Sequence, residues 1–281
     1  MTTQDLIDEI QAKNPKISQT QILERLEAER VKTGGLLGDE TLLRLIAAKF
    51  GVQVQQNHFH NSGVLSTSRL FAGLYDVTVA GRLIAVFPVK TFQGAEKAGK
   101  FATLILGDND GLLRVMLWNE KSEFVERGEL KAGQVIRLLH GYTREDRYGK
   151  TELHLGGKSQ IEIQPPTETS EYPPIEKFTA KINTLNANSG NVHLVGIVKA
   201  VFGKNGFTRG DDSDGVVMRL ALRDDSGEVT VVVWNEKVEE IECALRVSAR
   251  LLLVNARVKE AKNGAVEVHV DSITFVDAAS S

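Results

Sequence analysis

The stretch LILGDNDGLLRVMLWNEK, residues 104–121, recurs as LALRDDSGEVTVVVWNEK at residues 220–237. Nine of the 18 aligned positions are identical, including the whole Trp-Asn-Glu-Lys end. The similarity continues on both sides, for example in Val86-Phe87 and Val201-Phe202. Similarity over a long segment at a nearly constant spacing indicates a duplicated structural unit rather than a short recurring motif. The sequence therefore predicts two copies of one domain.

Each copy predicts five short strands with a helix between the third and the fourth. The first strand contains a glycine, Gly81 or Gly196, and a later hairpin turns on an Asp-x-x-Gly sequence. A charged helical stretch follows, and two more strands end the copy. This order is that of the OB barrel. We expect a mainly β chain with two tandem OB barrels, at residues 70–164 and 190–277, joined by a Pro-rich linker and lead-in at 165–189.

The first 52 residues predict a small helical domain. Ser18 and Gln21 form a capping-box pattern ahead of an apolar helix face. Asp39 can cap a further helix in which Leu42 and Ile46 belong to an apolar stripe. Three short helices are expected in residues 1–52, followed by a polar linker at 53–69. We expect this domain to dock a protein partner.

The composition is that of an ordinary globular protein, with 42% hydrophobic and 25% charged residues. Cys243 is the only cysteine, which excludes an internal disulfide and a cysteine-rich zinc site. The start lacks the pattern of a secretory signal, and no apolar run approaches the roughly 20 residues that span a bilayer. A cytoplasmic protein is expected.

The net charge of −3 argues against a uniformly basic coat, so any nucleic acid must occupy a locally basic groove.

The third strand of the first copy has two different faces. Strand alternation places Leu113, Val115 and Leu117 on one face, the expected barrel interior. Arg114, Met116 and Trp118 then lie on the outer face, where OB barrels bind oligonucleotides. A base can stack on Trp118 while Arg114 meets a phosphate. The second copy keeps Trp234 at this place, and the alternative for both tryptophans is packing under the helix as core residues.

Two loops of each copy add aromatic and basic residues. The early loop has Lys90 and Phe92 in the first copy, with Lys97 and Lys100, and Lys204, Phe207 and Arg209 in the second. Such residues suit a clamp over a single-stranded backbone. Phe87 and Phe202 are instead expected to close the barrel ends. The late loop has Arg144, Arg147, Tyr148 and Lys150 in the first copy and Lys262 in the second, and a solvated hairpin is the alternative for this loop.

No constellation of catalytic residues is apparent in the sequence. A Walker loop, a nucleophile elbow, a zinc signature and paired catalytic carboxylates are all missing. His154 and His269 recur in corresponding strands without a second ligand at metal spacing, so a structural role in the barrel is expected. The sequence predicts a protein that is not an enzyme and needs no metal or cofactor.

The duplicated motifs resemble those of archaeal replication protein A and, more distantly, the DNA-binding domains of the eukaryotic large subunit. The resemblance covers about residues 1–277 and rests on the Gly strand, the Leu-x-Asp-x-x-Gly turn, the Leu-Trp-Asn-Glu strand end and the late Glu-Leu-His-Leu strand. It implies sequence-independent binding of single-stranded DNA in replication, repair and recombination. It also implies that bases stack on Trp118, Tyr148 and Trp234. Asn263 stands where a counterpart of Tyr148 is expected, which implies weaker binding by the second barrel.

Two other functions remain open from the residues alone. An RNA-binding OB protein has the same features, because nothing here identifies a reader of the 2′-hydroxyl. A protein-interaction scaffold within a replication or repair complex is the second alternative. The response of Trp118 and Trp234 to an oligonucleotide distinguishes the scaffold from the binder.

Overall fold

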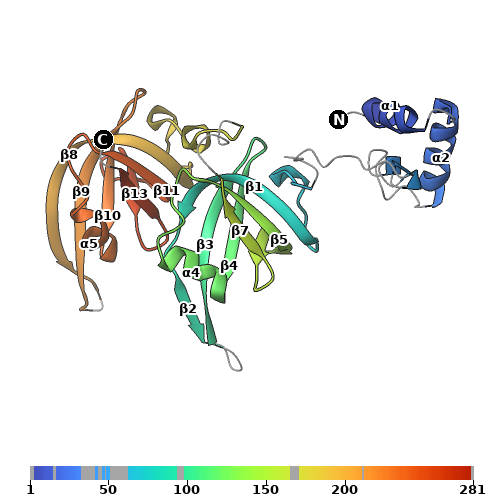
Figure 1. Ribbon diagram of the computed structural model, residues 1–281. Helices are drawn as coiled ribbons and strands as arrows, with labels where there is room; N and C mark the ends of the chain where they lie inside the picture. Colours follow the sequence, from blue (N-terminus) through green and yellow to red (C-terminus); the bar gives the residue numbers. More distant parts are fainter. Residues whose placement is uncertain are drawn as a thin grey trace. The chain divides into compact units, whose positions relative to one another are not determined.

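The computed structural model describes residues 3–14, 17–32, 42–43, 46–47, 49–50, 63–93, 98–164, 171–210 and 212–279 (Figure 1). It consists of two compact units, Met1–Ser62 and Gly63–Ser281, each of which is considered by itself. None of the described helices is long and apolar enough to cross a membrane.

The first unit contains the helices α1 (Thr3–Lys13) and α2 (Gln19–Lys32). The predicted capping box is present, since the Ser18 amide donates to the Gln21 side chain and the Gln21 amide donates to Ser18 Oγ. The apolar core combines residues of both helices with residues further along: Ile7, Ile10, Ile22, Leu26, Leu42, Leu43, Ile46 and Ala47. The third predicted helix and the linker at 53–69 lie partly outside the described residues, so three helices stay a prediction.

The first barrel closes with five strands. These are β1 (Tyr75–Val86), β3 (Ala98–Gly107), β4 (Leu112–Trp118), β6 (Thr151–Leu155) and β5 (Val135–Glu145), which pairs back with β1. β2 (Lys90–Gln93) pairs with β3 outside the closed barrel, and β7 (Gln160–Ile163) lies beside β5. A short helical segment, η2 (Asn119–Ser122) and α4 (Glu123–Glu126), stands between β4 and β5, as predicted for an OB barrel. The 3₁₀ turn η1 (Thr67–Arg69) precedes β1.

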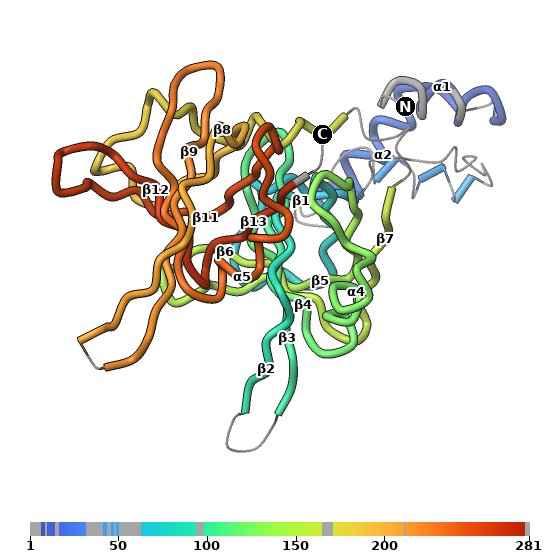
Figure 2. Tube along the Cα trace, turned by 90° about the vertical axis from the view of Figure 1, so that its left-hand side faces the viewer, coloured from blue at the N-terminus to red at the C-terminus, as the bar shows by residue number. Residues whose placement is uncertain are grey.

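The second barrel repeats this topology. Its strands are β8 (Asn191–Thr208), β9 (Asp214–Arg223), β10 (Glu228–Trp234), β12 (Val266–Val270) and β11 (Arg250–Glu260), which pairs back with β8. α5 (Glu236–Glu242) takes the place of α4, β13 (Phe275–Ala279) lies beside β11, and η4 (Ile175–Phe178) and η5 (Ile182–Thr184) form the lead-in. Each barrel extends a long hairpin arm, β2–β3 or β8–β9 (Figure 2). The architecture is therefore mainly β, with two closed five-stranded barrels consistent with tandem OB folds.

The repeated Asp-x-x-Gly turn ties each barrel to the segment that precedes it. One carboxylate oxygen of Asp108 accepts the amides of Asp110 and Gly111, and the other accepts the amide of Thr67. Asp224 accepts the amides of Ser226, Gly227 and Ile182 in the same way. This motif is duplicated because it closes a turn and anchors a lead-in, as Asp side chains do in Asx turns.

The glycine in the first strand of each barrel permits a close approach of the next strand. A Cβ on Gly81 would lie 2.6 Å from the Gly107 carbonyl oxygen, and a Cβ on Gly196 would lie 2.8 Å from that of Arg223. Such a distance is below any normal contact, so a side chain here would push the strands apart. Gly107 in the first copy and Arg223 in the second therefore occupy the same place opposite this glycine.

The Asn of the Trp-Asn pair explains why that pair recurs. Asn119 and Asn235 have φ angles of 48° and 52°, in the left-handed region that Asn tolerates better than most residues. Their side-chain oxygens accept the amides of Lys100 and Val216 on the adjacent strand, at 3.2 and 3.3 Å. The Asn thus ends the strand abruptly and holds the preceding tryptophan beside that strand.

The two barrels pack together through a small apolar cluster. Ile84 and Ala85 of β1 belong to it, together with Leu252 and Val254 of β11. Phe87 is also part of it, with its ring centroid 5.9 Å from that of Phe275. The expectation that Phe87 and Phe202 close the barrel ends is wrong. Phe87 packs against the neighbouring barrel, and Phe202 is 63% exposed.

Candidate nucleic-acid interface

The alternation predicted for β4 is present in the structure. Leu113, Val115 and Leu117 are buried in the barrel core, whereas Arg114 is exposed and Trp118 is half-buried on the outer face. Met116 also lies on that outer side but is covered, with its sulfur 3.5 Å from the Thr103 hydroxyl. The tryptophan is therefore neither a core residue nor fully exposed, and part of its ring is accessible.

Aromatic rings form a continuous row on the outer face of the first barrel. Phe92 meets Trp118 edge-on at 5.7 Å between centroids, and Phe101 lies 5.6 Å from the same indole. His154 lies 5.9 Å from Trp118, and Tyr142 follows at 5.3 Å from His154. The row runs from the β2–β3 arm across β4 and β6 to β5. Sequence reasoning identified Phe92 and Trp118 and missed Phe101 and Tyr142.

The row is held together by local features of the sequence. The ring of Phe92 lies across Gly99 on the paired strand, where any Cβ would collide with it. The indole nitrogen of Trp118 donates a 3.0 Å hydrogen bond to Nδ1 of His154. The structural role expected for this histidine is thus a contact with the predicted stacking residue.

Basic residues border the row. Lys90 is paired with Phe101 across β2–β3 and so shares the face of Trp118. The Arg144 guanidinium lies 5.1 Å from the Tyr142 ring centroid. Arg114 forms a 2.9 Å ion pair with Glu152, a neighbour on β6. Burial, followed by the positive charges of Arg144 and Arg114, lowers the pKa of His154 to about 4, so this histidine is neutral at pH 7.

The late hairpin of the first barrel presents the other predicted residues. Tyr148 is 69% exposed, and the Arg147 guanidinium lies 4.7 Å from its ring centroid. Lys150 is exposed at the same turn, where its amide donates to the Asp146 carboxylate. An exposed ring with a guanidinium over it offers a second stacking surface.

The second barrel repeats the centre of this row. Phe207 meets Trp234 edge-on at 5.6 Å, and its ring lies across Gly215 as that of Phe92 lies across Gly99. The indole of Trp234 donates a 3.0 Å hydrogen bond to Nδ1 of His269. Arg209 lies 5.7 Å from the Phe207 ring centroid and also donates to Ser213 and to the Asp214 carbonyl.

An arginine replaces one ring of the row in the second barrel, and two further cations lie beside it. Register places Arg257 opposite His269, where Tyr142 lies opposite His154 in the first barrel. Arg219 and Lys259 occupy the corresponding places of Thr103 and Arg144. The proximity of Lys259 and Arg219 adds to burial in lowering the pKa of His269. Strand alternation on the flanking strands was the signal that could have identified these three cations.

Two predicted basic residues lie elsewhere. Lys204 is paired with the core residue Met218, so it points away from the face of Trp234, and its Nζ lies 2.7 Å from Glu242 of α5. Lys100 similarly pairs with Glu126 of α4 at 2.7 Å. Lys262 is exposed at the tip of the β11–β12 hairpin. Lys97 lies outside the described residues.

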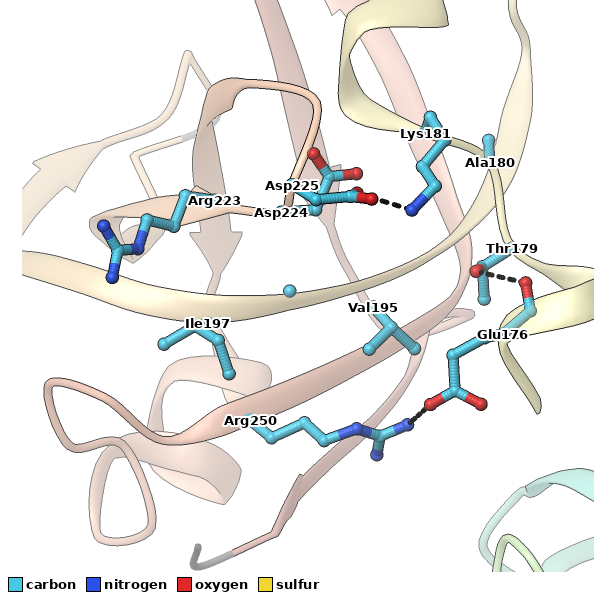
Figure 3. Close-up of a pocket in the computed structure, with 11 residues that line it drawn as sticks. Glu176, Thr179, Ala180, Lys181, Val195, Ile197, Arg223, Asp224, Asp225 and Arg250 are labelled. Carbon is cyan, nitrogen blue, oxygen red and sulfur yellow. Dashed lines mark hydrogen bonds and ion pairs between the residues drawn. The ribbon is translucent and has the colours of Figure 1, made fainter. Parts of the chain in front are cut away.

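A cavity of about 290 Å³ lies apart from both rows of rings, at the starts of β8 and β11 (Figure 3). Its charged groups are largely paired, with Arg250 2.6 Å from Glu176 and Lys181 2.5 Å from Asp225. It is lined by no aromatic residue. Among the residues that the structure describes, no group of His, Cys, Asp and Glu could hold a metal ion. The outer faces with the tryptophans are therefore the candidate site.

The chain is similar to one family model and to several known proteins. A family model described as an OB-fold nucleic acid binding domain matches residues 192–276. Replication factor A of Methanothermobacter thermautotrophicus is 24% identical over 214 residues, covering 73% of this chain and 26% of that protein. An uncharacterised 18.7 kDa protein of the ribosomal RNA operon of Thermofilum pendens is 29% identical over 136 residues, covering 48% of this chain and 64% of that protein. The resemblance to archaeal replication protein A is thus confirmed, and the chain spans about a quarter of that relative's length.

The fold has a solved counterpart. A replication protein A heterotrimer bound to single-stranded DNA superposes with a TM-score of 0.57 at 14% identity, covering 77% of this chain and 52% of that one. At this identity the match concerns the fold, and it agrees with the two closed barrels described above.

Proposed function

We propose that this chain binds single-stranded DNA along the outer faces of its two barrels. Bases stack on the half-buried indoles and their aromatic neighbours, while Lys and Arg side chains contact the phosphates. The observation that supports this most directly is the repeated pair of Trp118 with Phe92 and Trp234 with Phe207, each beside exposed cations. A protein scaffold has no need of two identical, partly open indoles at corresponding positions.

The relatives support the choice of DNA. The similar protein of Methanothermobacter is named replication factor A, and the heterotrimer of similar fold is bound to single-stranded DNA. We therefore extend the proposal to a binding role, rather than a catalytic one, in DNA replication, repair and recombination in the cytoplasm. The helical domain at residues 1–52 is proposed to dock another replication or repair protein. If its removal weakens DNA affinity severalfold, that assignment is wrong.

Binding by stacking predicts that the protein accepts DNA of any base sequence. Every base has a π face, and each stacked base is worth about 1–3 kcal/mol. Two barrels imply a footprint of roughly 8–30 nucleotides, from the range seen for single barrels. A duplex hides its base faces inside the helix, so it should bind far more weakly.

The test is a titration of intrinsic fluorescence, because Trp118 and Trp234 are the only tryptophans. We expect strong quenching by oligo-dT, weakening as salt rises, and little quenching by a duplex of equal length. Oligo-U serves as a third ligand, and tighter binding of it than of oligo-dT would assign the chain to RNA. No change at saturating oligonucleotide would overturn the proposal in favour of a protein scaffold.

A further inference from the structure

A tryptophan–histidine hydrogen bond is present in both barrels although their surroundings differ. Nε1 of Trp118 lies 3.0 Å from Nδ1 of His154, and the distance from Trp234 to His269 is also 3.0 Å. Around this pair, Tyr142 is replaced by Arg257 and Arg114 by Thr230. Because this hydrogen bond is present in both barrels while the residues around it differ, it indicates that both indoles need it.

The geometry fixes the plane of each indole. The N–H of an indole points along the ring plane, and the planes of Trp118 and His154 differ by only 14°. The two rings are therefore nearly parallel, with 5.9 Å between their centroids, and the second pair is similar, with 22° between the planes and 5.8 Å between the centroids. The hydrogen bond holds the N–H edge of the indole and so restricts rotation of the ring about its side-chain torsions.

The second ring nitrogen of each histidine lies near a carboxylate of its own strand, although Nε2 of His154 is buried and makes no hydrogen bond to any described residue. Because Nδ1 accepts the indole proton, the ring proton of the neutral histidine resides on Nε2. That atom lies 3.5 Å from the carboxylate of Glu152 in the first barrel and 3.5 Å from that of Glu267 in the second. The Glu-x-His spacing places both side chains on one face of the strand. Burial lowers the pKa of both histidines, which keeps Nδ1 an acceptor at neutral pH.

We propose that His154 and His269 are positioning residues of the DNA interface, which hold Trp118 and Trp234 in the orientation that receives a base. Their side chains are only 9% and 12% exposed, so they act through the tryptophans rather than by touching DNA. Without the hydrogen bond an indole can turn, and stacking then has to order it at an entropic cost. This inference rests on the proposed function.

The experiment compares His154→Leu with His154→Gln in the full chain. Leu removes the acceptor and keeps an apolar filling, whereas the Gln side-chain oxygen can accept the indole proton. His193→Leu is the matched control, since His193 is half-buried and, like His154, accepts through Nδ1, but from the Asn255 amide. Three quantities are measured: the affinity for oligo-dT, the thermal midpoint, and the NMR signal and solvent exchange of each indole N–H, assigned with Trp234→Phe.

His154→Leu should weaken oligo-dT binding by about three- to tenfold, the worth of one hydrogen bond. The Trp118 indole N–H should exchange faster, and His154→Gln should recover most of both effects. His193→Leu should lower the thermal midpoint without changing affinity. An unchanged affinity in His154→Leu, or an equal loss in His193→Leu, would overturn the positioning role. Failure of the unmodified chain to bind oligo-dT would instead overturn the proposed function itself, and the positioning role with it.

Discussion

The two barrels share one backbone plan but differ in the chemistry of their outer faces. The first has Phe101 and Tyr142 in its row of rings and Tyr148 on its late hairpin, at places where the second has Val217, Arg257 and Asn263. The second has Arg219 where the first has Thr103. The two barrels therefore share the central Trp–His pair, but the second lacks these three rings and has Arg257 and Arg219 near the pair. We infer that the first barrel binds mainly by stacking and the second mainly through phosphates.

The largest expected difference concerns the tryptophans. Trp118→Ala should weaken oligo-dT binding by about 1–3 kcal/mol, because it removes a stacked base and the support of Phe92 and Phe101. Trp234→Ala should cost less, since fewer rings surround it. Affinities measured by fluorescence anisotropy with labelled oligo-dT test this. An equal or larger loss in Trp234→Ala would remove the distinction between the barrels.

Lowering the pH should reduce the stability of the first barrel because of the lowered pKa of His154. Its pKa is lowered to about 4, whereas an unfolded histidine has a pKa of 6.5, so the unfolded state binds more protons between these values. Stability is therefore complete above pH 6.5 and falls by about 1–2 kcal/mol as pH drops towards 5. Burial raises the pKa of Glu152, which acts in the opposite direction in this range.

Chemical unfolding of the full chain and of His154→Gln at pH 7 and pH 5 measures the histidine contribution. The variant should lose less stability than the unmodified chain on acidification. An identical loss in both proteins would show that His154 does not control this response.

A smaller difference between the barrels is expected in how strongly salt weakens their binding of DNA. Replacing Arg219 and Arg257 by Gln removes two candidate phosphate contacts, so the slope of log affinity against log salt should fall by about 1.4. Arg250→Gln is the control, because that guanidinium is paired with Glu176 at the separate cavity. Binding isotherms at four or more salt concentrations give the slopes. If the control changes the slope as much as the double variant, the phosphates do not follow the second barrel's outer face.

The smallest effect concerns the late hairpins. The turns match, since Gly149 donates to Asp146 as Gly264 donates to Ala261, which aligns Tyr148 with Asn263. Tyr148→Ala should weaken oligo-dT binding severalfold, and Asn263→Tyr should strengthen it by a similar factor, about 1 kcal/mol for an exposed stack. The same anisotropy titrations measure both. No gain from Asn263→Tyr would show that the hairpin tip does not contact the bases.

Much of the architecture followed from the repeat. Duplicated turn, strand and helix signals predicted the two barrels, and alternation correctly placed Leu113, Val115 and Leu117 inside and Trp118 outside. These features depend on residues close together in sequence. Arg219 and Arg257 were missed because alternation shows which residues of a strand share a face, but only the register between strands far apart in the chain shows that this is the face of Trp234.

Lys204 shows a different limit. A bulge between Val201 and Lys204 inserts one residue into β8. Because side chains alternate along a strand, one extra residue changes the face on which every following residue lies. The basic loop composition was recognised, but its direction towards α5 could not be read without the bulge.

The packing of one barrel on the next has a consequence for assembly. A contact between two different surfaces of a repeated unit leaves one unused surface at each end, and such contacts can extend into open filaments. In this chain both unused surfaces differ from the surfaces that form the joint. Lys199 stands at the place of Ile84 on the second barrel, while Arg137 and Gln160 stand at the places of Leu252 and Phe275 on the first. The two unused surfaces thus carry polar side chains where the joint between the barrels has apolar ones, so this joint does not promote polymerisation of the chain.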